Sequence, residues 1–236
     1  MKKSSLIRAA VTAVLCVAVL NVIFRNYVGN YYHAKSYQLH TEQFEETEDY
    51  IVLGNPDSEY GFIFYPGARV EETAYIPLLD ELSGADICCV LVKMPYRLAI
   101  FSPNAAADVM ESVDGIEHWY LGGHSLGGAM AASYAASHED ELEGLVLLAA
   151  YPTRELEELP VLSVYGSEDG VLSRKTYERA IGRAGELTEH VIEGGNHSGF
   201  GNYGQQKKDH AATVTAEEQW QETVDYILNF IAEKGV

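Results

Sequence analysis

A serine flanked by two glycines is the first group in this sequence that could perform chemistry. The pentapeptide Gly-His-Ser-Leu-Gly fits the pattern G-x-S-x-G, with Ser125 at its centre. The same pattern also occurs by chance in glycine-rich turns that precede a helix. A serine hydroxyl is a weak nucleophile, so it needs an adjacent base that is itself oriented by an acid. The rest of the chain must therefore provide these two groups.

An acid and a base follow this serine, each directly after a predicted strand. Asp169 lies in VYGSEDGV, and His197 lies in the glycine-rich segment IEGGNHSGFGNYG. Because the carboxyl ends of parallel strands meet at one edge of a sheet, residues at these positions can converge. The chain order Ser, Asp, His is also a known order for such triads. We predict Ser125 as nucleophile, His197 as base and Asp169 as acid, with Glu168 as the alternative acid.

Other side chains are weaker candidates for the same site. His124 is either a packing residue or a proton carrier, and we favour packing. Arg69 is either a guide for an anionic acyl group or a surface residue. Five aromatic residues are candidates for lining a pocket, although packing explains them equally well: Tyr65, Tyr96, Phe101, Phe200 and Tyr203. The histidines are scattered and neither CxxC nor HExxH occurs, so we predict no metal site and no cofactor.

The elements that must position these residues alternate between strand and helix from about residue 49. This alternation predicts an α/β fold with a mostly parallel central sheet and helices on both faces. No segment is long enough for a large lid. The predicted strands are 49–54, 60–67, 85–95, 116–123, 142–152, 159–169 and 187–197; the predicted helices are 71–84, 102–113, 125–141, 173–185 and 215–235.

The serine lies where one of these strands ends and a helix of small residues begins. A tight turn at this point would lift the hydroxyl of Ser125 to the carboxyl edge of the sheet. Gly123 and Gly127 then have a steric reason to be glycine, because side chains there would crowd the neighbouring strand and helix.

Three segments together resemble the α/β-hydrolase superfamily. They are FYPGARV after an early strand, GHSLGG at the turn and GGNHSGFGNYG near the end. The resemblance covers about residues 49–236 and is nearest to the small lidless serine hydrolases and esterases, the dienelactone-hydrolase-like group. It implies a minimal α/β-hydrolase fold in which Ser125, His197 and Asp169 are nucleophile, base and acid.

The resemblance also implies an oxyanion hole. One donor would be the backbone N–H of Leu126, which follows the nucleophile. The second would come from the loop after the early strand, from Ala68 or, as the alternative, from Gly67. Donors of this kind stabilise the tetrahedral intermediate and are worth roughly 3 kcal/mol each.

The first 25 residues predict a membrane signal. A basic start precedes an uncharged run from Ala9 to Phe24, which as a helix would span about 24 Å. We favour an uncleaved anchor that leaves the body outside the cytoplasm, because basic residues precede the run. A cleaved signal peptide, giving a secreted protein, and a buried helix are the alternatives. The predicted organisation is anchor 1–25, linker 26–48 and catalytic domain 49–236.

Charge and cysteine content limit the partners. The formal net charge is −19, and residues 26–236 carry 12 basic and 35 acidic side chains. Such a body would be repelled by nucleic acid and by anionic membrane surfaces. Cys88 and Cys89 are adjacent in a predicted strand and point to opposite faces, so we expect no disulfide between them. The sequence indicates no oligomeric state.

These observations favour a serine hydrolase that cleaves a carboxylic ester of a small or short-acyl substrate through an acyl-enzyme. Thioester, lactone and amide bonds are open to the same triad, because the pocket and not the fold selects the substrate. A different class of function is a membrane-tethered binding protein on a catalytically inactive hydrolase scaffold.

Overall fold

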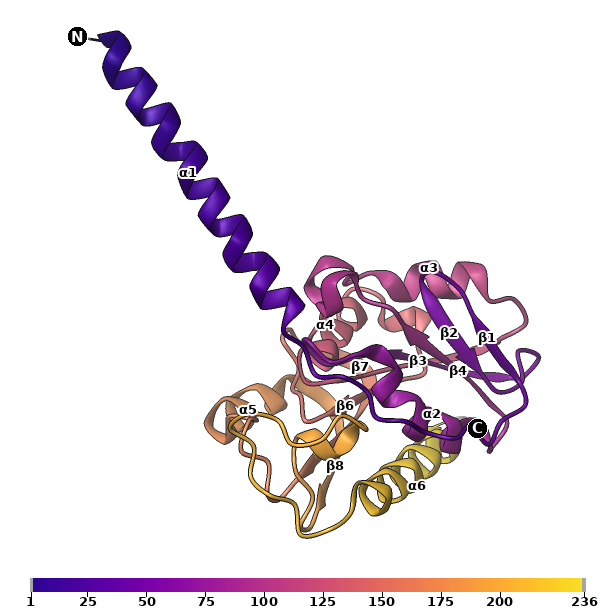
Figure 1. Ribbon diagram of the computed structural model, residues 1–236. Coiled ribbons are helices and arrows are strands. Elements are labelled where there is room, and N and C mark those ends of the chain that lie inside the picture. Colours follow the sequence, from indigo (N-terminus) through magenta and orange to yellow (C-terminus); the bar gives the residue numbers. More distant parts are fainter. Residues whose placement is uncertain (1, 235–236) are drawn as a thin grey trace. The chain divides into compact units, whose positions relative to one another are not determined.

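The first unit of the protein is a single helix. The computed structural model describes residues 2–234 and divides into two compact units, Met1–Tyr31 and Tyr32–Val236. Helix α1 (Lys2–Gly29) makes up most of the first unit (Figure 1). Its window Val11–Gly29 has a mean hydropathy of 1.8 and no buried residue, so it is long and apolar enough to cross a membrane. A signal sequence near the N-terminus has the same properties.

The second unit is built around a twisted sheet, which in the described residues has eight strands in the order β1-β2-β4-β3-β5-β6-β7-β8. All neighbours from β4 to β8 are parallel, and β1 and β2 form an antiparallel edge. This confirms the mostly parallel sheet predicted from the alternating pattern. The strands are β1 (Phe44–Glu46), β2 (Tyr50–Leu53), β3 (Tyr60–Tyr65), β4 (Ile87–Val92), β5 (His118–His124), β6 (Gly144–Leu148), β7 (Leu156–Gly166) and β8 (Ala184–Ile192).

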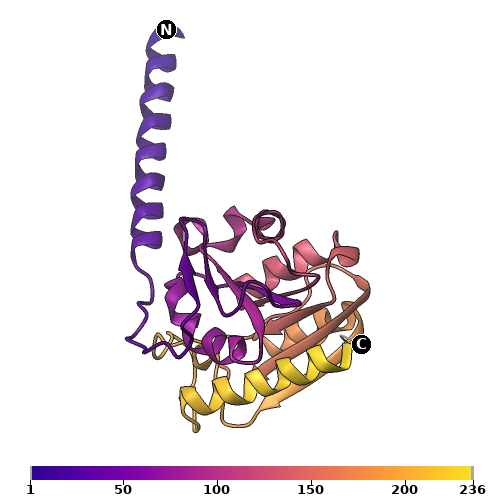
Figure 2. The same cartoon turned by 90° about the vertical axis from the view of Figure 1, so that its right-hand side faces the viewer.

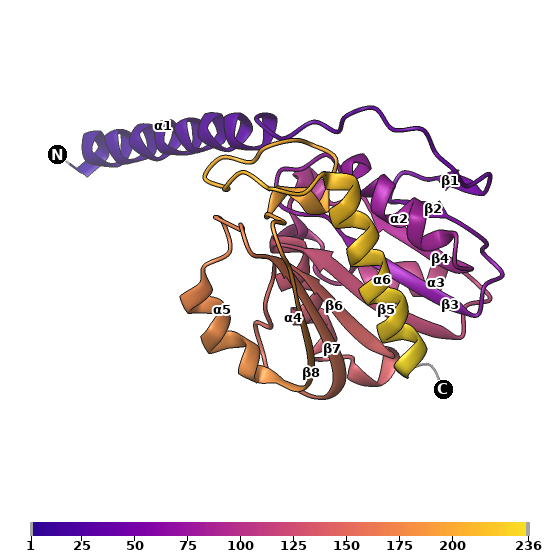
Figure 3. The same ribbon diagram turned by 90° about the horizontal axis from the view of Figure 1, so that it is seen from below.

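Helices cover both faces of this sheet. One face packs against α2 (Ile76–Ser83) and α6 (Ala216–Lys234), which lie side by side in Figure 3; Figure 2 shows α6 along the sheet. The other face packs against α3 (Ala105–Ser112) and α4 (Leu126–Ala135), and α5 (Arg174–Ala180) lies beyond them over β7. No segment between these described elements is long enough for a large lid, as predicted.

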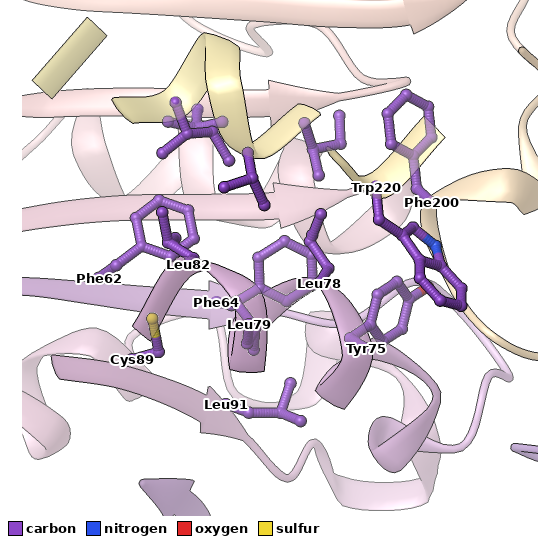
Figure 4. Close-up of a cluster of buried hydrophobic side chains, with 14 of the residues drawn as sticks. Phe62, Phe64, Tyr75, Leu78, Leu79, Leu82, Cys89, Leu91, Phe200 and Trp220 are labelled. Atoms are coloured by element: carbon purple, nitrogen blue, oxygen red, sulfur yellow. The ribbon is translucent and has the colours of Figure 1, made fainter. Parts of the chain in front are cut away.

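Alternation along the strands divides the core into two clusters. On β3, Phe62 and Phe64 point to the α2–α6 face (Figure 4), whereas Ile63 points to the α3–α4 face. Cys88 and Cys89 of β4 likewise belong to opposite clusters and are both free. The continuous apolar runs in the sequence therefore correspond to strands that are buried on both faces.

The segment that follows α1 is fixed to the second unit by hydrogen bonds. Tyr32 N–H donates to the carbonyl of Arg69 (2.7 Å). Further along, the buried carboxylate of Asp80 accepts from the N–H groups of His40 (2.7 Å) and Thr41 (2.9 Å). Part of the segment predicted as a linker is thus hydrogen-bonded to the sheet unit, although its residues are exposed or half-buried.

Candidate active site

Ser125 lies at the sharp turn between β5 and α4. Its φ and ψ are 54° and −118°, so a residue other than glycine adopts left-handed backbone here. Its N–H donates to the carbonyl of Leu148, at the end of β6, over 2.9 Å. Such a conformation costs of order 1–3 kcal/mol and persists only where surrounding contacts impose it. This is the strand–turn–helix context that the G-x-S-x-G pattern predicts.

The two glycines of the pattern are required by close backbone contacts. A Cβ atom on Gly123 would lie 2.7 Å from the backbone of Gly127 and Gly128. A Cβ atom on Gly127 would collide with the carbonyl oxygen of Tyr65, at the end of β3. The steric reason given by the sequence is therefore correct. The start of α4 is pressed against the loop that follows β3, where Ala68 lies.

Asp169 and His197 form a hydrogen-bonded pair. The Nδ1 atom of His197 is 2.8 Å from Oδ2 of Asp169, and both side chains are buried. The other carboxylate oxygen, Oδ1, accepts from the N–H groups of Val171 (2.8 Å) and Leu172 (2.7 Å). The structure thus pairs His197 with Asp169 and not with the neighbouring Glu168.

These contacts determine the protonation of the pair. Burial alone would raise the pKa of Asp169, but the hydrogen bond and charge of His197, together with the two backbone donors, outweigh it and lower the pKa. The carboxylate is therefore ionised and can only accept hydrogen bonds. The shared proton must therefore reside on Nδ1 of His197. In the neutral imidazole this tautomer has its lone pair on Nε2, which is the form that acts as a base.

Ser125 and His197 line the same pocket, whose volume is about 290 Å³. In the part of the chain that the structure describes, Nε2 of His197 is buried and has no hydrogen-bond partner, so the structure forms no bond between it and the Ser125 hydroxyl. Such bonds are often long before substrate binds. The lining residues are Ser125, Leu126, Ala129, Ala149, Ala150, Tyr151, Val171, Leu172, Ser173 and His197.

Of the expected oxyanion donors, Leu126 lines this pocket at the start of α4, whereas Ala68 and Gly67 lie in the loop after β3 and are not among its lining residues. The N–H of Gly67 donates to Oη of Tyr75 over 3.1 Å, so this amide is already used. Among the described residues, the N–H groups of Leu126 and Ala68 have no acceptor. Of the two alternatives in the loop after β3, Ala68 is therefore the one with an available donor.

The aromatic residues that we considered for the pocket lie elsewhere. Tyr65 is buried and donates to the carbonyl of Pro103, and Phe200 packs in the core on the α2–α6 side (Figure 4). Tyr96 and Phe101 are exposed and contact each other edge to face. Tyr203 belongs to the core, and Arg69 is absent from the lining as well.

Tyr151 and Leu172 line the pocket instead, and the sequence did not single them out. They lie in the loops after β6 and β7, at the same edge of the sheet as Ser125. Their position after a strand was the signal that could have identified them.

Asp209 is a site residue that sequence analysis missed. Its Oδ1 atom accepts from the N–H groups of Gly170 (3.1 Å) and His197 (3.3 Å). Its Oδ2 atom accepts from the N–H (2.8 Å) and hydroxyl (2.7 Å) of Ser198. The carboxylate therefore joins the loop of Asp169 to the loop of His197. Asp209 follows no strand and has no characteristic spacing to the triad, so no pattern identified it.

A second hollow lies far from these residues. A larger hollow of about 450 Å³ lies at the opposite end of the sheet, between the starts of β6 and β7, and is lined mainly by carboxylates. It contains no histidine or serine, so it lacks the base and the nucleophile. Among the residues that the structure describes, no group of three His, Cys, Asp or Glu side chains is arranged to bind a metal ion.

The comparison with protein families identifies the class of this protein. Residues 61–221 match the model of the Alpha/beta hydrolase family. Because this match spans more than half of the chain and includes the three residues discussed above, the protein belongs to the α/β-hydrolase family. No match was found among curated proteins.

Solved structures share the fold at low sequence identity. Est1E from Butyrivibrio proteoclasticus is 15% identical with a TM-score of 0.57, and the match covers 80% of this chain and 98% of that chain. Monoacylglycerol lipase from Paleococcus ferrophilus is 14% identical with a TM-score of 0.61, covering 79% and 99%. MGS-MChE2, an α/β hydrolase from a lagoon-sediment metagenome, is 13% identical with a TM-score of 0.61, covering 83% and 100%.

Proposed function

We propose that this protein is a serine hydrolase that cleaves carboxylic esters with a small or short acyl group. The observation that carries the proposal is the Asp169–His197 hydrogen bond beside the strained Ser125, in one pocket. Nε2 of His197 takes the proton of the Ser125 hydroxyl as its oxygen attacks the ester carbonyl. The imidazolium that forms is stabilised by the Asp169 carboxylate.

The remaining steps use the same groups. The N–H groups of Leu126 and Ala68 donate to the oxyanion of the tetrahedral intermediate. His197 then returns the proton to the departing alcohol, which leaves an acyl group on Ser125. A water molecule, deprotonated by His197, attacks this acyl-enzyme and releases the acid.

The pocket supports a small substrate. Its volume is about 290 Å³, and three alanines together with Val171 and Leu172 give it a largely apolar lining. A pocket of this kind would accept a short neutral acyl chain. The names of two structural neighbours, a monoacylglycerol lipase and an Est1E structure with bound ferulic acid, fit ester chemistry in this family. The small size and the absence of a lid in the described residues support a place in the dienelactone-hydrolase-like group.

Hydrolysis of a series of p-nitrophenyl esters by the full chain tests this proposal. We expect acetate and butyrate to be cleaved much faster than palmitate, because a long chain exceeds the pocket. Ser125→Ala should lower kcat at least about 10⁴-fold, since the nucleophile is lost. Ser112→Ala, which changes an exposed serine of α3, is the matched control and should retain the wild-type rate. Equal rates for wild type and Ser125→Ala would refute the proposal, and if both equal the uncatalysed rate they would favour the binding-protein alternative.

A further inference from the structure

A chain of two hydrogen bonds beside Ser125 links the loop after β3, the 3-10 turn Glu72–Tyr75 and the end of β5. The N–H of Gly67, in the loop after β3, is 3.1 Å from Oη of Tyr75. The same Oη atom is 2.8 Å from Nδ1 of His124, the last residue of β5 and the neighbour of Ser125. Tyr75 and His124 are both fully buried, so this chain has no competition from solvent. It connects the loop that holds Ala68 to the turn that holds the serine.

The direction of each hydrogen bond follows from the donors. A backbone N–H can only donate, so Oη of Tyr75 accepts from Gly67. Burial raises the pKa of Tyr75, which therefore keeps its single proton and donates it to Nδ1 of His124. Burial and the neighbouring His197 imidazole hold the pKa of His124 well below its usual range, so its ring is neutral. Because Tyr75 has a single proton to donate and Nδ1 of His124 lies 2.8 Å from its Oη atom, we assign Nδ1 as the acceptor. The proton of the neutral His124 ring then lies on Nε2, which is buried and has no hydrogen-bond partner among the described residues.

His124 also contacts the base. Its ring centroid is 4.6 Å from that of His197, and it packs against Phe200 at 5.7 Å. These hydrogen-bonded groups are tightly packed, because a Cβ atom on Gly67 would lie 2.7 Å from both Tyr75 Oη and His124 Nδ1. His124 is therefore linked to three parts of the proposed site. It is linked through Tyr75 to the loop of Gly67 and Ala68, which we call the oxyanion loop. It directly precedes Ser125 in the sequence, and its ring contacts His197.

We infer that Tyr75 and His124 are positioning residues that fix the oxyanion loop relative to Ser125. By binding the N–H of Gly67, Tyr75 turns that amide away from the pocket and orients the following peptide, so that the N–H of Ala68 can face the oxyanion. This inference rests on the proposed hydrolase function. A donor placed in advance stabilises the transition state more than the ground state, so its displacement should lower kcat and leave KM nearly unchanged.

Tyr75→Phe is the direct test, because it removes only the hydroxyl. With p-nitrophenyl butyrate we expect kcat to fall about 10- to 100-fold, with KM within about twofold, because complete loss of one oxyanion donor costs about 10²–10³. Binding of a trifluoromethyl ketone, which forms a tetrahedral oxyanion on the serine, should weaken by the same factor as kcat/KM. Tyr203→Phe is the matched control, since Tyr203 is a buried neighbour whose hydroxyl donates only to Gln206 (3.1 Å).

A pair of substitutions at His124 provides a second test that does not depend on Tyr75→Phe folding. An asparagine side chain can place an oxygen near the position of Nδ1 and accept from Tyr75, whereas a glutamine side chain extends its amide to the position of Nε2. We expect His124→Asn to retain at least tenfold more of kcat than His124→Gln. If Tyr75 and His124 only stabilised the fold, their substitution would lower the melting temperature, but it would not lower kcat selectively while KM stays unchanged.

Titration of the wild type and each variant with a fluorophosphonate normalises kcat to the number of active sites. A Tyr75→Phe kcat per titrated site within twofold of wild type, or equal kcat for His124→Asn and His124→Gln, would overturn the inference and leave the hydrolase proposal intact. A wild-type chain that is folded and takes no label would overturn both.

Discussion

At the scale of single residues, Asp169 determines which nitrogen of His197 carries a proton. Both carboxylate oxygens of Asp169 accept hydrogen bonds: Oδ1 from two backbone N–H groups and Oδ2 from the imidazole. The sequence placed Asp169 and His197 at the same edge of the sheet, because each follows a strand, and the structure joins them by a hydrogen bond. It could not identify Tyr75 or Asp209, since a hydrogen bond between distant loops leaves no spacing pattern in the chain.

Asp169→Asn should lower kcat by about 10⁴-fold with little change in KM. The asparagine amide can donate to Nδ1 of His197, which moves the imidazole proton to Nε2 and removes the base. The measurement is kcat for p-nitrophenyl butyrate at neutral pH. Glu168→Gln, at the adjacent position, should stay within twofold of wild type. A comparable loss in Glu168→Gln would assign the acid to Glu168, the alternative that the sequence left open.

At the scale of elements, periodicity predicted the strands of the core and their mostly parallel arrangement. The predicted helix 71–84 instead begins with the 3-10 turn Glu72–Tyr75, and α2 follows with Pro77 in its first turn. This difference matters, because the short turn presents the Tyr75 hydroxyl to Gly67 in the loop that follows β3. Helix periodicity alone does not distinguish a 3-10 turn from an α-helix.

The segment after α1 was the least predictable element. It lacks an apolar period, so it had the appearance of a linker. From Tyr32 onward it nevertheless belongs to the second unit, where Tyr32 bridges to Val70, directly after Ala68 and Arg69 of the loop that follows β3. Whether such a segment pairs with the rest of the fold depends on the backbone groups that lie beside it, and the segment's own residues do not reveal these.

Helix α1 is proposed to anchor the protein in a membrane with the sheet unit outside the cytoplasm. If so, the full-length chain should remain in the membrane pellet after extraction with alkaline carbonate. A variant with both Val14→Glu and Val17→Glu should move to the supernatant, because each charge near the centre of a span costs about 2.5–3.5 kcal/mol. A soluble wild type whose intact mass lacks the first residues would instead indicate a cleaved signal.

At the scale of the whole molecule, the fold, the acidic charge and the site are consistent with one another. Apart from its basic first 25 residues the chain is strongly acidic, which disfavours nucleic acid as a substrate. The partner that we propose for the pocket is a small neutral ester. The family match and the structural neighbours establish the α/β-hydrolase fold. The chemistry depends on whether Ser125 is an activated nucleophile.

Labelling of the full chain with a fluorophosphonate tests this central claim most directly. Intact mass and peptide mapping would report how many adducts form and on which residue. We predict one adduct, on Ser125, absent from Ser125→Ala and formed far more slowly in His197→Ala, because the base is needed to activate the hydroxyl. A folded wild-type chain that forms no adduct, or forms it on another serine, would contradict the account.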